Sequence, residues 1–265
     1  MLLNPVGANV MAMNVKLDHK QAVAIVTINR PERRNAVDGA TALELFAVFE
    51  QIDADDSVHV AILHGASGYF CAGADLKALS DGDRRPVTDG GMAPMGPTRM
   101  QMTKPVIAAI EGYAVAGGME LALWCDLRVM AETARMGVFC RRFGVPLVDM
   151  GTIRLPRLIG QSRAMDLLLT GREVGAAEAL EMGLANRVTR HGGALELAVD
   201  LASQIAAFPQ TCMRNDRASA LAQWQLSDAD AIALEAQLGR ETIQSGETLS
   251  GASSFALGKG RHGAF

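Results

Sequence analysis

The sequence predicts an α/β protein with a parallel β-sheet, and three observations support this fold class. Short apolar segments rich in β-branched residues alternate with segments of helical periodicity along the first two thirds of the chain. Two of the short segments lead directly into glycine-containing turns. From about residue 193 the pattern is almost entirely helical. We therefore expect a core with the functional site in residues 1–192 and a helical region in residues 193–265.

The first strands and the helix between them set the topology. Residues 22–28 are apolar and β-branched, and residues 58–65 repeat that composition. Between them, apolar residues recur at helical spacing over residues 43–52, with Asp38 or Thr41 as the capping residue. A strand, a helix and a strand over this distance imply a right-handed crossover and a parallel pair. Further strands are expected at residues 105–112 and 127–131, with shorter ones at residues 136–139 and 185–188.

Two glycine-containing turns indicate a functional site. Gly117 and Gly118 stand at the start of an apolar helix, directly after an expected strand, and residues 66–77 form a second such turn. Backbone amides without a neighbouring Cβ can approach a ligand oxygen closely, and a helix start favours negative charge. Because both turns follow parallel strands, we expect them to converge as an oxyanion site. Glu120, in the first turn of the helix, is either an acid satisfied by backbone amides or a catalytic base.

Residues 81–98 differ in composition from the segments on either side. They contain many Gly, Pro and Asp residues and no helical or strand periodicity. We therefore expect a mobile surface segment, and mobile loops beside functional sites often act as lids.

Composition and charge limit the classes of partner. The 265 residues carry a formal net charge of -4, and no basic block is interleaved with aromatic residues, so we expect no nucleic-acid partner. No apolar run reaches the ~20 residues of a membrane span, and we expect no secretory or transit peptide in residues 1–20. The four cysteines form no Cys-x-x-Cys pair and have no histidine at ligand spacing. This favours reduced thiols, no metal site, no membrane partner and a cytoplasmic location.

Three blocks of sequence resemble the signature of a known family. They are residues 70–76 (Phe-Cys-Ala-Gly-Ala-Asp-Leu), residues 104–121 and residues 127–132. Their order and spacing are similar to those of the crotonase, or enoyl-CoA hydratase/isomerase, superfamily. The resemblance implies a spiral of ββα units in place of a simple doubly wound sheet, followed by a C-terminal helical trimerisation region. It also implies an acyl-CoA substrate, no cofactor other than the coenzyme A of that substrate, and a homotrimer or a dimer of trimers.

The resemblance assigns roles to individual residues. Ala74 and Gly117 stand where family members provide the two backbone N–H groups of an oxyanion hole for the thioester carbonyl. Glu120 stands at the first of two glutamate positions with which hydratases of the family handle water and a proton. Residues 30–36 match the loop that contacts the CoA nucleotide. The expected CoA contacts are Arg33, Ala36, Asp75, Leu76 and Lys77, of which Lys77 is alternatively a solvated surface charge.

One position departs from the family pattern. The second glutamate position aligns with Cys140, and a thiol with a pKa of ~8.5 is a poor substitute for a carboxylate. Asp149 is another candidate catalytic partner for Glu120, because some dienoyl-CoA isomerases of the superfamily carry an aspartate at a similar position. Alternatively, Asp149 caps the helix that follows it.

These residues leave three hypotheses for function. The first is an enoyl-CoA hydratase-like enzyme that uses Glu120 for water activation or proton transfer. The second is an acyl-CoA double-bond isomerase that uses Glu120 and Asp149. The third is a non-catalytic CoA-thioester-binding protein, which the replacement of the second glutamate by Cys140 suggests.

Overall fold

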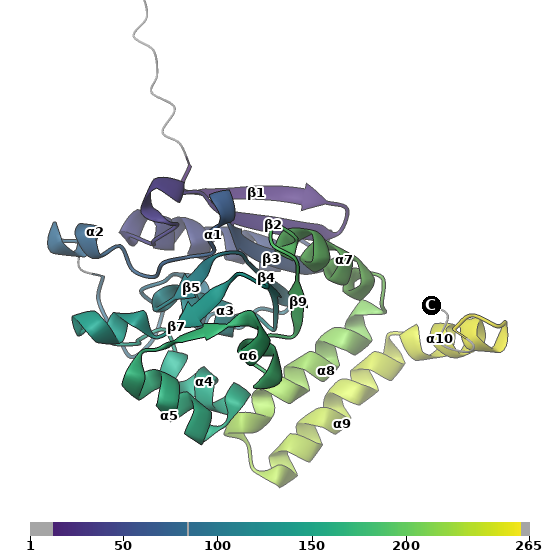
Figure 1. The fold of residues 1–265 in the computed structure, drawn as a ribbon. Coiled ribbons are helices and arrows are strands. Elements are labelled where there is room, and N and C mark those ends of the chain that lie inside the picture. Colours follow the sequence, from purple (N-terminus) through teal and green to yellow (C-terminus); the bar gives the residue numbers. More distant parts are fainter. Residues whose placement is uncertain (1–12, 84, 261–265) are drawn as a thin grey trace, which may run out of the picture.

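The computed structural model describes residues 13–83 and 85–260, and a six-stranded sheet forms its centre (Figure 1). The strands are β1 (Val15–Lys20), β2 (Val23–Ile28), β3 (Val60–Gly65), β4 (Val106–Ile110), β6 (Leu127–Ala131) and β9 (Arg187–Thr189). Their order is β1-β2-β3-β4-β6-β9, and every neighbouring pair except β1 and β2 is parallel. The predicted parallel sheet is confirmed, and β1 adds an antiparallel edge that the sequence patterns do not predict.

Alternating side chains along the strands build two cores, one on each face of the sheet. On one face, Ile62 and Ile107 pack with Ala198 of α7 (Ala194–Ala206). On the other face, the alternate residues of the same strands join α1 (Gly39–Ala54) and α3 (Gly117–Trp124) in the larger core. Helices α1 and α3 are crossovers between strands, whereas α7 returns from the C-terminal part of the chain. Successive crossovers therefore cover only one face, unlike in a doubly wound sheet.

A second layer of extended segments follows the strands of the large sheet. Its strands are β5 (Tyr113–Val115), β7 (Arg135–Gly137) and β8 (Glu173–Gly175). Strand β4 continues into β5 and then α3, and β6 continues into β7, which pairs in parallel with β5. Isolated bridges join Cys71 to Ala114 and Val37 to Ala74, so the segments after β3 and β2 continue the same layer. This repetition is the spiral of ββα units that the sequence resemblance implies.

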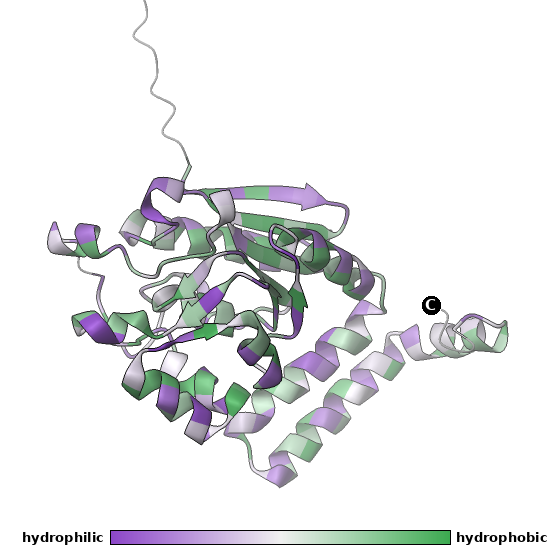
Figure 2. Cartoon of the chain, in the orientation of Figure 1, coloured by the Kyte–Doolittle hydropathy of each residue, from purple (hydrophilic) through white to green (hydrophobic). Residues whose placement is uncertain are grey.

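The C-terminal part of the chain is helical, as predicted. Helices α8 (Gln210–Ala222) and α9 (Asp228–Gln244) form a pair beside the core, and α10 (Glu247–Ala256) projects from it (Figure 1). Figure 2 shows hydrophilic and hydrophobic residues mixed along α8 and α9. Arg217 of α8 is tied to the core by a 2.8 Å ion pair with Asp126. Across residues 13–83 and 85–260, no helix is both long and apolar enough to cross a membrane.

Two segments differ from the sequence prediction. The second half of residues 81–98 is not a mobile surface, because Ala93, Met95 and Thr98 are buried in the core. The sequence of residues 154–160 predicts a segment that leads to a helix ending near Gly171, but most of this segment is itself helical, with Pro156 inside α4 (Gly151–Ile159). The remaining helices are α2 (Leu76–Ser80), α4 (Gly151–Ile159), α5 (Gln161–Thr170) and α6 (Ala176–Glu181).

Candidate active site

A cavity of about 240 Å³ lies where the two predicted glycine-containing turns meet. Ala74 from the first turn and Gly117 from the second both line it, as predicted for converging turns. Most of the remaining lining is apolar and comes from α2, from residues 85–95 and from residues 139–149. The ionisable side chains on its wall, among the described residues, are Arg85, Glu120, Cys140 and Asp149.

Gly73 packs the two turns against each other. Its φ of +94° lies in the left-handed region, and a Cβ built on it would lie 3.0 Å from the amide nitrogen of Gly117. Any larger residue at this position would push the turns apart, so the glycine sets the separation of the two candidate donors.

The amides of Ala74 and Gly117 are free to donate to a ligand. The Val37 amide donates to the carbonyl of Gly73, and the Asp75 amide donates to the carbonyl of Val37. In this parallel bridge between Val37 and Ala74, the amide of Ala74 points away from Val37. Gly117 is the first residue of α3, so its amide has no partner within the helix. Within residues 13–83 and 85–260, neither amide donates a hydrogen bond to the protein. Two such donors beside one cavity form an arrangement suited to a developing oxyanion.

Glu120 is buried on the cavity wall, with only 2% of its surface exposed. Its Oε1 accepts hydrogen bonds from the amide of Asp149 at 2.9 Å and from the amide of Gly151 at 2.8 Å. Burial, followed by the nearby Asp149, raises the pKa of Glu120 to about 8 despite the two amides. The interpretation as an acid satisfied by backbone amides is therefore confirmed. The interpretation as a catalytic base stays a prediction, and the position of Glu120 on the cavity wall and its pKa are compatible with it.

Asp149 is equally buried and also lines the cavity. Its Oδ1 accepts hydrogen bonds from the amide of Met95 at 2.9 Å and from the Thr98 hydroxyl at 2.5 Å. Burial is the largest cause that raises the pKa of Asp149. The alternative that Asp149 caps the next helix is wrong, because the N-cap of α4 is Met150 and no side chain caps it.

Cys140 lies on the cavity wall within a short 3₁₀ helix (Phe139–Phe143). Burial and the neighbouring Glu120 raise the pKa of the thiol, so the group is neutral at physiological pH. Arg141 follows it in sequence but donates its Nε to the carbonyl of Leu168. The second glutamate position of the family therefore holds an uncharged, weakly polar side chain.

The residues predicted to contact CoA occupy different environments. Leu76 lines the cavity and is exposed, and Lys77 is exposed on the same short helix. Arg33 is exposed in the turn after β2, whereas Ala36 is buried and its carbonyl accepts a hydrogen bond from Arg30. These positions remain predictions as CoA contacts.

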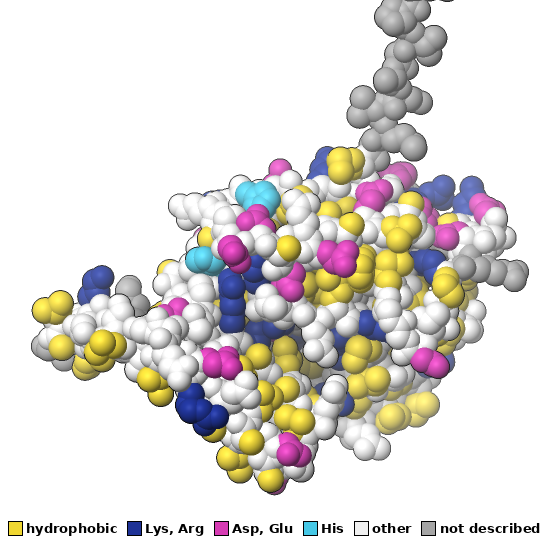
Figure 3. Space-filling view, turned by 180° about the vertical axis from the view of Figure 1, so that it is seen from behind, with side chains coloured by type: hydrophobic (Ala, Val, Ile, Leu, Met, Phe, Trp, Pro, Cys, Tyr) yellow, Lys and Arg dark blue, Asp and Glu magenta, His cyan; other side chains and the backbone are white. Residues whose placement is uncertain are grey.

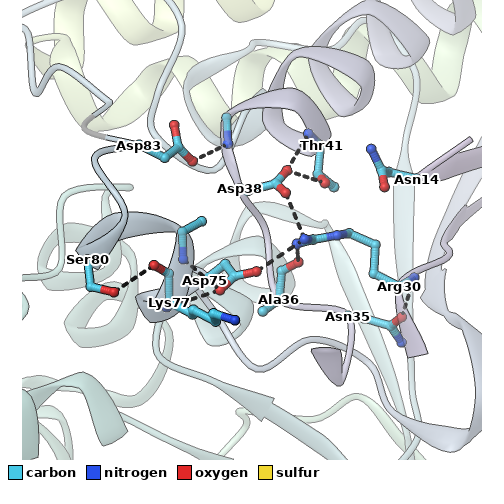
Figure 4. Close-up of polar contacts among 12 residues, drawn as sticks. Asn14, Arg30, Asn35, Ala36, Asp38, Thr41, Asp75, Lys77, Ser80 and Asp83 are labelled. Atoms are coloured by element: carbon cyan, nitrogen blue, oxygen red, sulfur yellow. Dashed lines mark hydrogen bonds and ion pairs between the residues drawn. The ribbon is translucent and has the colours of Figure 1, made fainter. Parts of the chain in front are cut away.

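Asp75 is the predicted CoA contact that has clear interactions within the protein (Figure 4). Its Oδ1 accepts from the amides of Lys77 and Ala78 and so caps α2. Its Oδ2 lies 3.1 Å from Nη2 of Arg30, and the same nitrogen pairs with Asp38 at 2.7 Å. Because Asp75 directly follows Ala74, this half-buried cluster fixes the turn that presents the Ala74 amide.

Sequence comparison assigns this fold and cavity to a family. A family model described as enoyl-CoA hydratase/isomerase matches residues 18–259. The chain therefore belongs to the enoyl-CoA hydratase/isomerase family, as its sequence motifs predict.

Individual relatives agree with this assignment. Enoyl-CoA hydratase EchA19 of Mycobacterium tuberculosis is 36% identical over 242 residues, which cover 88% of this chain and 89% of the relative. Carnitinyl-CoA dehydratase of Proteus mirabilis is 37% identical over 198 residues, which cover 74% and 76%. The crystal structure of enoyl-CoA hydratase EchA1 from Mycobacterium marinum matches with a TM-score of 0.87 at 35% identity, covering 92% of this chain and 96% of that chain. The crotonase-type fold is thus confirmed.

Proposed function

We propose that the protein is an enoyl-CoA hydratase that adds water across the conjugated double bond of a 2-enoyl-CoA. The observation that carries this proposal is the position of Glu120 on the same cavity as two free amides, those of Ala74 and Gly117. Hydration of a 2-enoyl thioester generates an enolate on the thioester oxygen and moves protons at the adjacent carbons. The cavity thus offers donors for the charge and a base for the proton.

Glu120 serves both proton transfers in the proposed mechanism. Its carboxylate takes a proton from water while the water oxygen bonds to Cβ and the π electrons move to the thioester oxygen. The amides of Ala74 and Gly117 hold the resulting enolate. The protonated Glu120 then delivers its proton to Cα as the thioester carbonyl re-forms. One carboxyl group completes this cycle unchanged, so the neutral Cys140 is not required as a second acid.

Hydration of crotonyl-CoA by the purified protein tests this proposal. We expect the conjugated-enoyl absorbance to fall with the wild-type protein, and the Glu120→Gln variant to be slower by about 10³-fold. A Glu120→Gln variant as fast as the wild type would refute the proposed role. Binding of acyl-CoA without turnover over a range of chain lengths would instead favour the non-catalytic hypothesis.

Double-bond isomerisation is a second candidate, favoured by the second buried carboxyl group on the cavity wall, that of Asp149. In this reaction the two acids would move a proton between carbons without adding water. The Asp149→Asn variant distinguishes the two reactions, because the amide side chain retains an oxygen acceptor for Met95 and Thr98. Loss of isomerase activity together with retained hydratase activity would assign Asp149 to isomerisation, whereas full isomerase activity would exclude that role.

The C-terminal helices support the proposed homotrimer or dimer of trimers. Leu249, Phe255 and Leu257 are strongly exposed on or next to α10, and Figure 3 shows hydrophobic side chains on this projecting arm. Exposed apolar side chains of this size are typical of an interface. Light scattering should give three or six times the 28.1 kDa chain mass.

We further propose a cytoplasmic enzyme without a separate cofactor, consistent with four free cysteines.

A further inference from the structure

Among the residues that the structure describes, Arg85 is the one cationic side chain on the wall of the cavity that Ala74 and Gly117 line. Its neighbours on that wall include the apolar side chains of Leu79, Val87 and Pro94. The proposed hydration chemistry makes no use of a cation at this position. A guanidinium group in such surroundings indicates recognition of an additional group on the ligand.

One peptide group links Arg85 to the reacting end of the cavity. Nη1 of Arg85 donates to the carbonyl of Pro94, and the N–H of the same peptide, at Met95, donates to Oδ1 of Asp149 at 2.9 Å. Met95 also packs on the turn that contains Gly117, because a Cβ built on Gly117 would lie 2.6 Å from Sδ of Met95. The guanidinium is therefore held at a fixed position relative to the candidate catalytic groups.

Apart from Nη1, the guanidinium has no hydrogen-bond partner among the residues that the structure describes. Among residues 13–83 and 85–260, no acceptor binds Nε or Nη2 of Arg85, and no carboxylate lies within ion-pair distance of it. The N–H groups on these two nitrogens remain available to a ligand. Together they match the two oxygens of a carboxylate, which arginine binds in a bidentate geometry.

The electrostatics of the cavity favour an anionic group beside Arg85. Burial raises the pKa of Glu120 to about 8, so below that pH Glu120 is mostly neutral. Burial also raises the pKa of Asp149, whereas the charge of Arg85 acts on it in the opposite direction. A ligand carboxylate would therefore meet the charge of Arg85 with little repulsion from Glu120.

We propose that Arg85 is a specificity residue that binds a carboxylate on the acyl chain, beyond the reacting carbons. The preferred substrates are then 2-enoyl-CoA thioesters of dicarboxylic acids. This inference rests on the proposed function in one respect, namely that an acyl-CoA binds in the cavity.

Arg85 could instead bind a phosphate of the CoA. Every acyl-CoA carries these phosphates, so such a contact would give no preference for one acyl chain over another.

Binding of saturated analogues tests the proposal without turnover. Calorimetry compares glutaryl-CoA with valeryl-CoA, and adipyl-CoA with hexanoyl-CoA, so that each pair has the same chain length and differs in the terminal carboxylate. We expect at least tenfold tighter binding of the carboxylated member in one of the pairs. Equal affinities, or weaker binding of the carboxylated member in both pairs, would overturn the proposal.

Variants connect the preference to Arg85. In Arg85→Met the preference should disappear, and Arg85→Lys should restore part of it because the positive charge remains. If Arg85→Met weakens both members of each pair equally, the residue binds a part common to all acyl-CoAs and the proposal is wrong. Thermal melting of each variant verifies folding, and the conservative lysine variant keeps the test valid if the methionine variant is unstable.

Arg99→Met is the matched control. Arg99 ends the 3₁₀ turn Pro97–Arg99 and donates to the carbonyls of Thr88 and Val148, but it does not line the cavity. Its replacement should leave the ratio of affinities unchanged, and loss of the preference in this variant would also contradict the assignment to Arg85. Absence of hydration with the ratio intact would refute the proposed function alone.

Discussion

The two sides of the cavity are built in different ways. The amides of Ala74 and Gly117 belong to turns that follow strands of the spiral and are held by β-bridges and by the close approach of Gly73. The carboxyl groups of Glu120 and Asp149 are instead held by hydrogen bonds from the amides of residues 95, 149 and 151, which belong to no strand.

This difference distinguishes groups whose positions are set by the spiral fold from groups whose positions depend on residues outside the strands. In this chain the two candidate oxyanion donors are backbone amides whose positions follow from the spiral and from the glycine at position 73. The positions of the two candidate catalytic carboxyl groups depend on residues 93–98 and 149–151, which belong to no strand. We infer that the oxyanion side sets the substrate class, a CoA thioester, and that the carboxyl side sets the reaction.

Next to the loss expected for Glu120→Gln, the largest expected effect comes from crowding the carboxyl side. In Gly151→Ala the new Cβ would lie 2.7 Å from Oε1 of Glu120, so the carboxylate must move. A displacement of about 1 Å at a reacting group costs about 10²-fold in rate, and we expect that loss in kcat for crotonyl-CoA.

Gly175→Ala is the control for this substitution. The nearest atom to its built Cβ is 3.7 Å away and its φ is not positive, so the backbone accepts alanine without strain. Its kcat should stay close to that of the wild type. Equal activity of the two variants would show that the position of Glu120 is not set by Gly151.

An intermediate effect is expected on the oxyanion side. Asp75→Asn keeps an oxygen that can cap α2 but removes the charge that pairs with Arg30. We expect the free energy of unfolding to fall by about 2 kcal/mol, and kcat to fall by about tenfold because the Ala74 amide adjoins the altered residue. Urea unfolding and steady-state kinetics measure the two effects.

Asp83→Asn separates stability from positioning. Asp83 accepts a 2.7 Å hydrogen bond from the amide of Gly39, and its side chain forms no hydrogen bond with the turn that contains Ala74. This variant should lose stability without a change in kcat. A similar fall in kcat for both variants would mean that the Arg30 cluster has no specific effect on the turn.

The smallest effect is expected at Cys140. Its thiol is neutral at physiological pH because burial and Glu120 raise its pKa. Cys140→Ser should therefore hydrate crotonyl-CoA within about threefold of the wild type. A loss of about 100-fold would show that the thiol takes part in proton transfer and would undermine the mechanism with one carboxyl group.

The sequence predicts the oxyanion side better than the carboxyl side. Gly117 and Gly118 directly follow an expected strand at a recognisable helix start, so local patterns identify this turn. The partners of Asp149, in contrast, are Met95 and Thr98, which lie more than fifty residues away and within a segment of loop composition. Hydrogen bonds between distant irregular segments leave no periodic signal.

Local rules also mislead at α4. Pro156 lies inside this helix although proline in a helix interior removes a hydrogen bond, so the pattern suggests a break. Packing of Leu155 and Ile159 into the core compensates for that cost. The ion pairs of Arg30 with Asp38 and Asp75 likewise depend on tertiary structure, and no motif in the sequence indicates them.

The pH dependence of kcat/KM for crotonyl-CoA tests the central claim most directly, because Glu120 is a base only when it is ionised. Its pKa is raised to about 8, so the group is protonated below that pH and active above it. We predict that kcat/KM rises about tenfold per pH unit below 8 and levels off above it. A profile that is already flat from pH 5.5 upward would mean that Glu120 ionises as an ordinary glutamate, and would contradict the account.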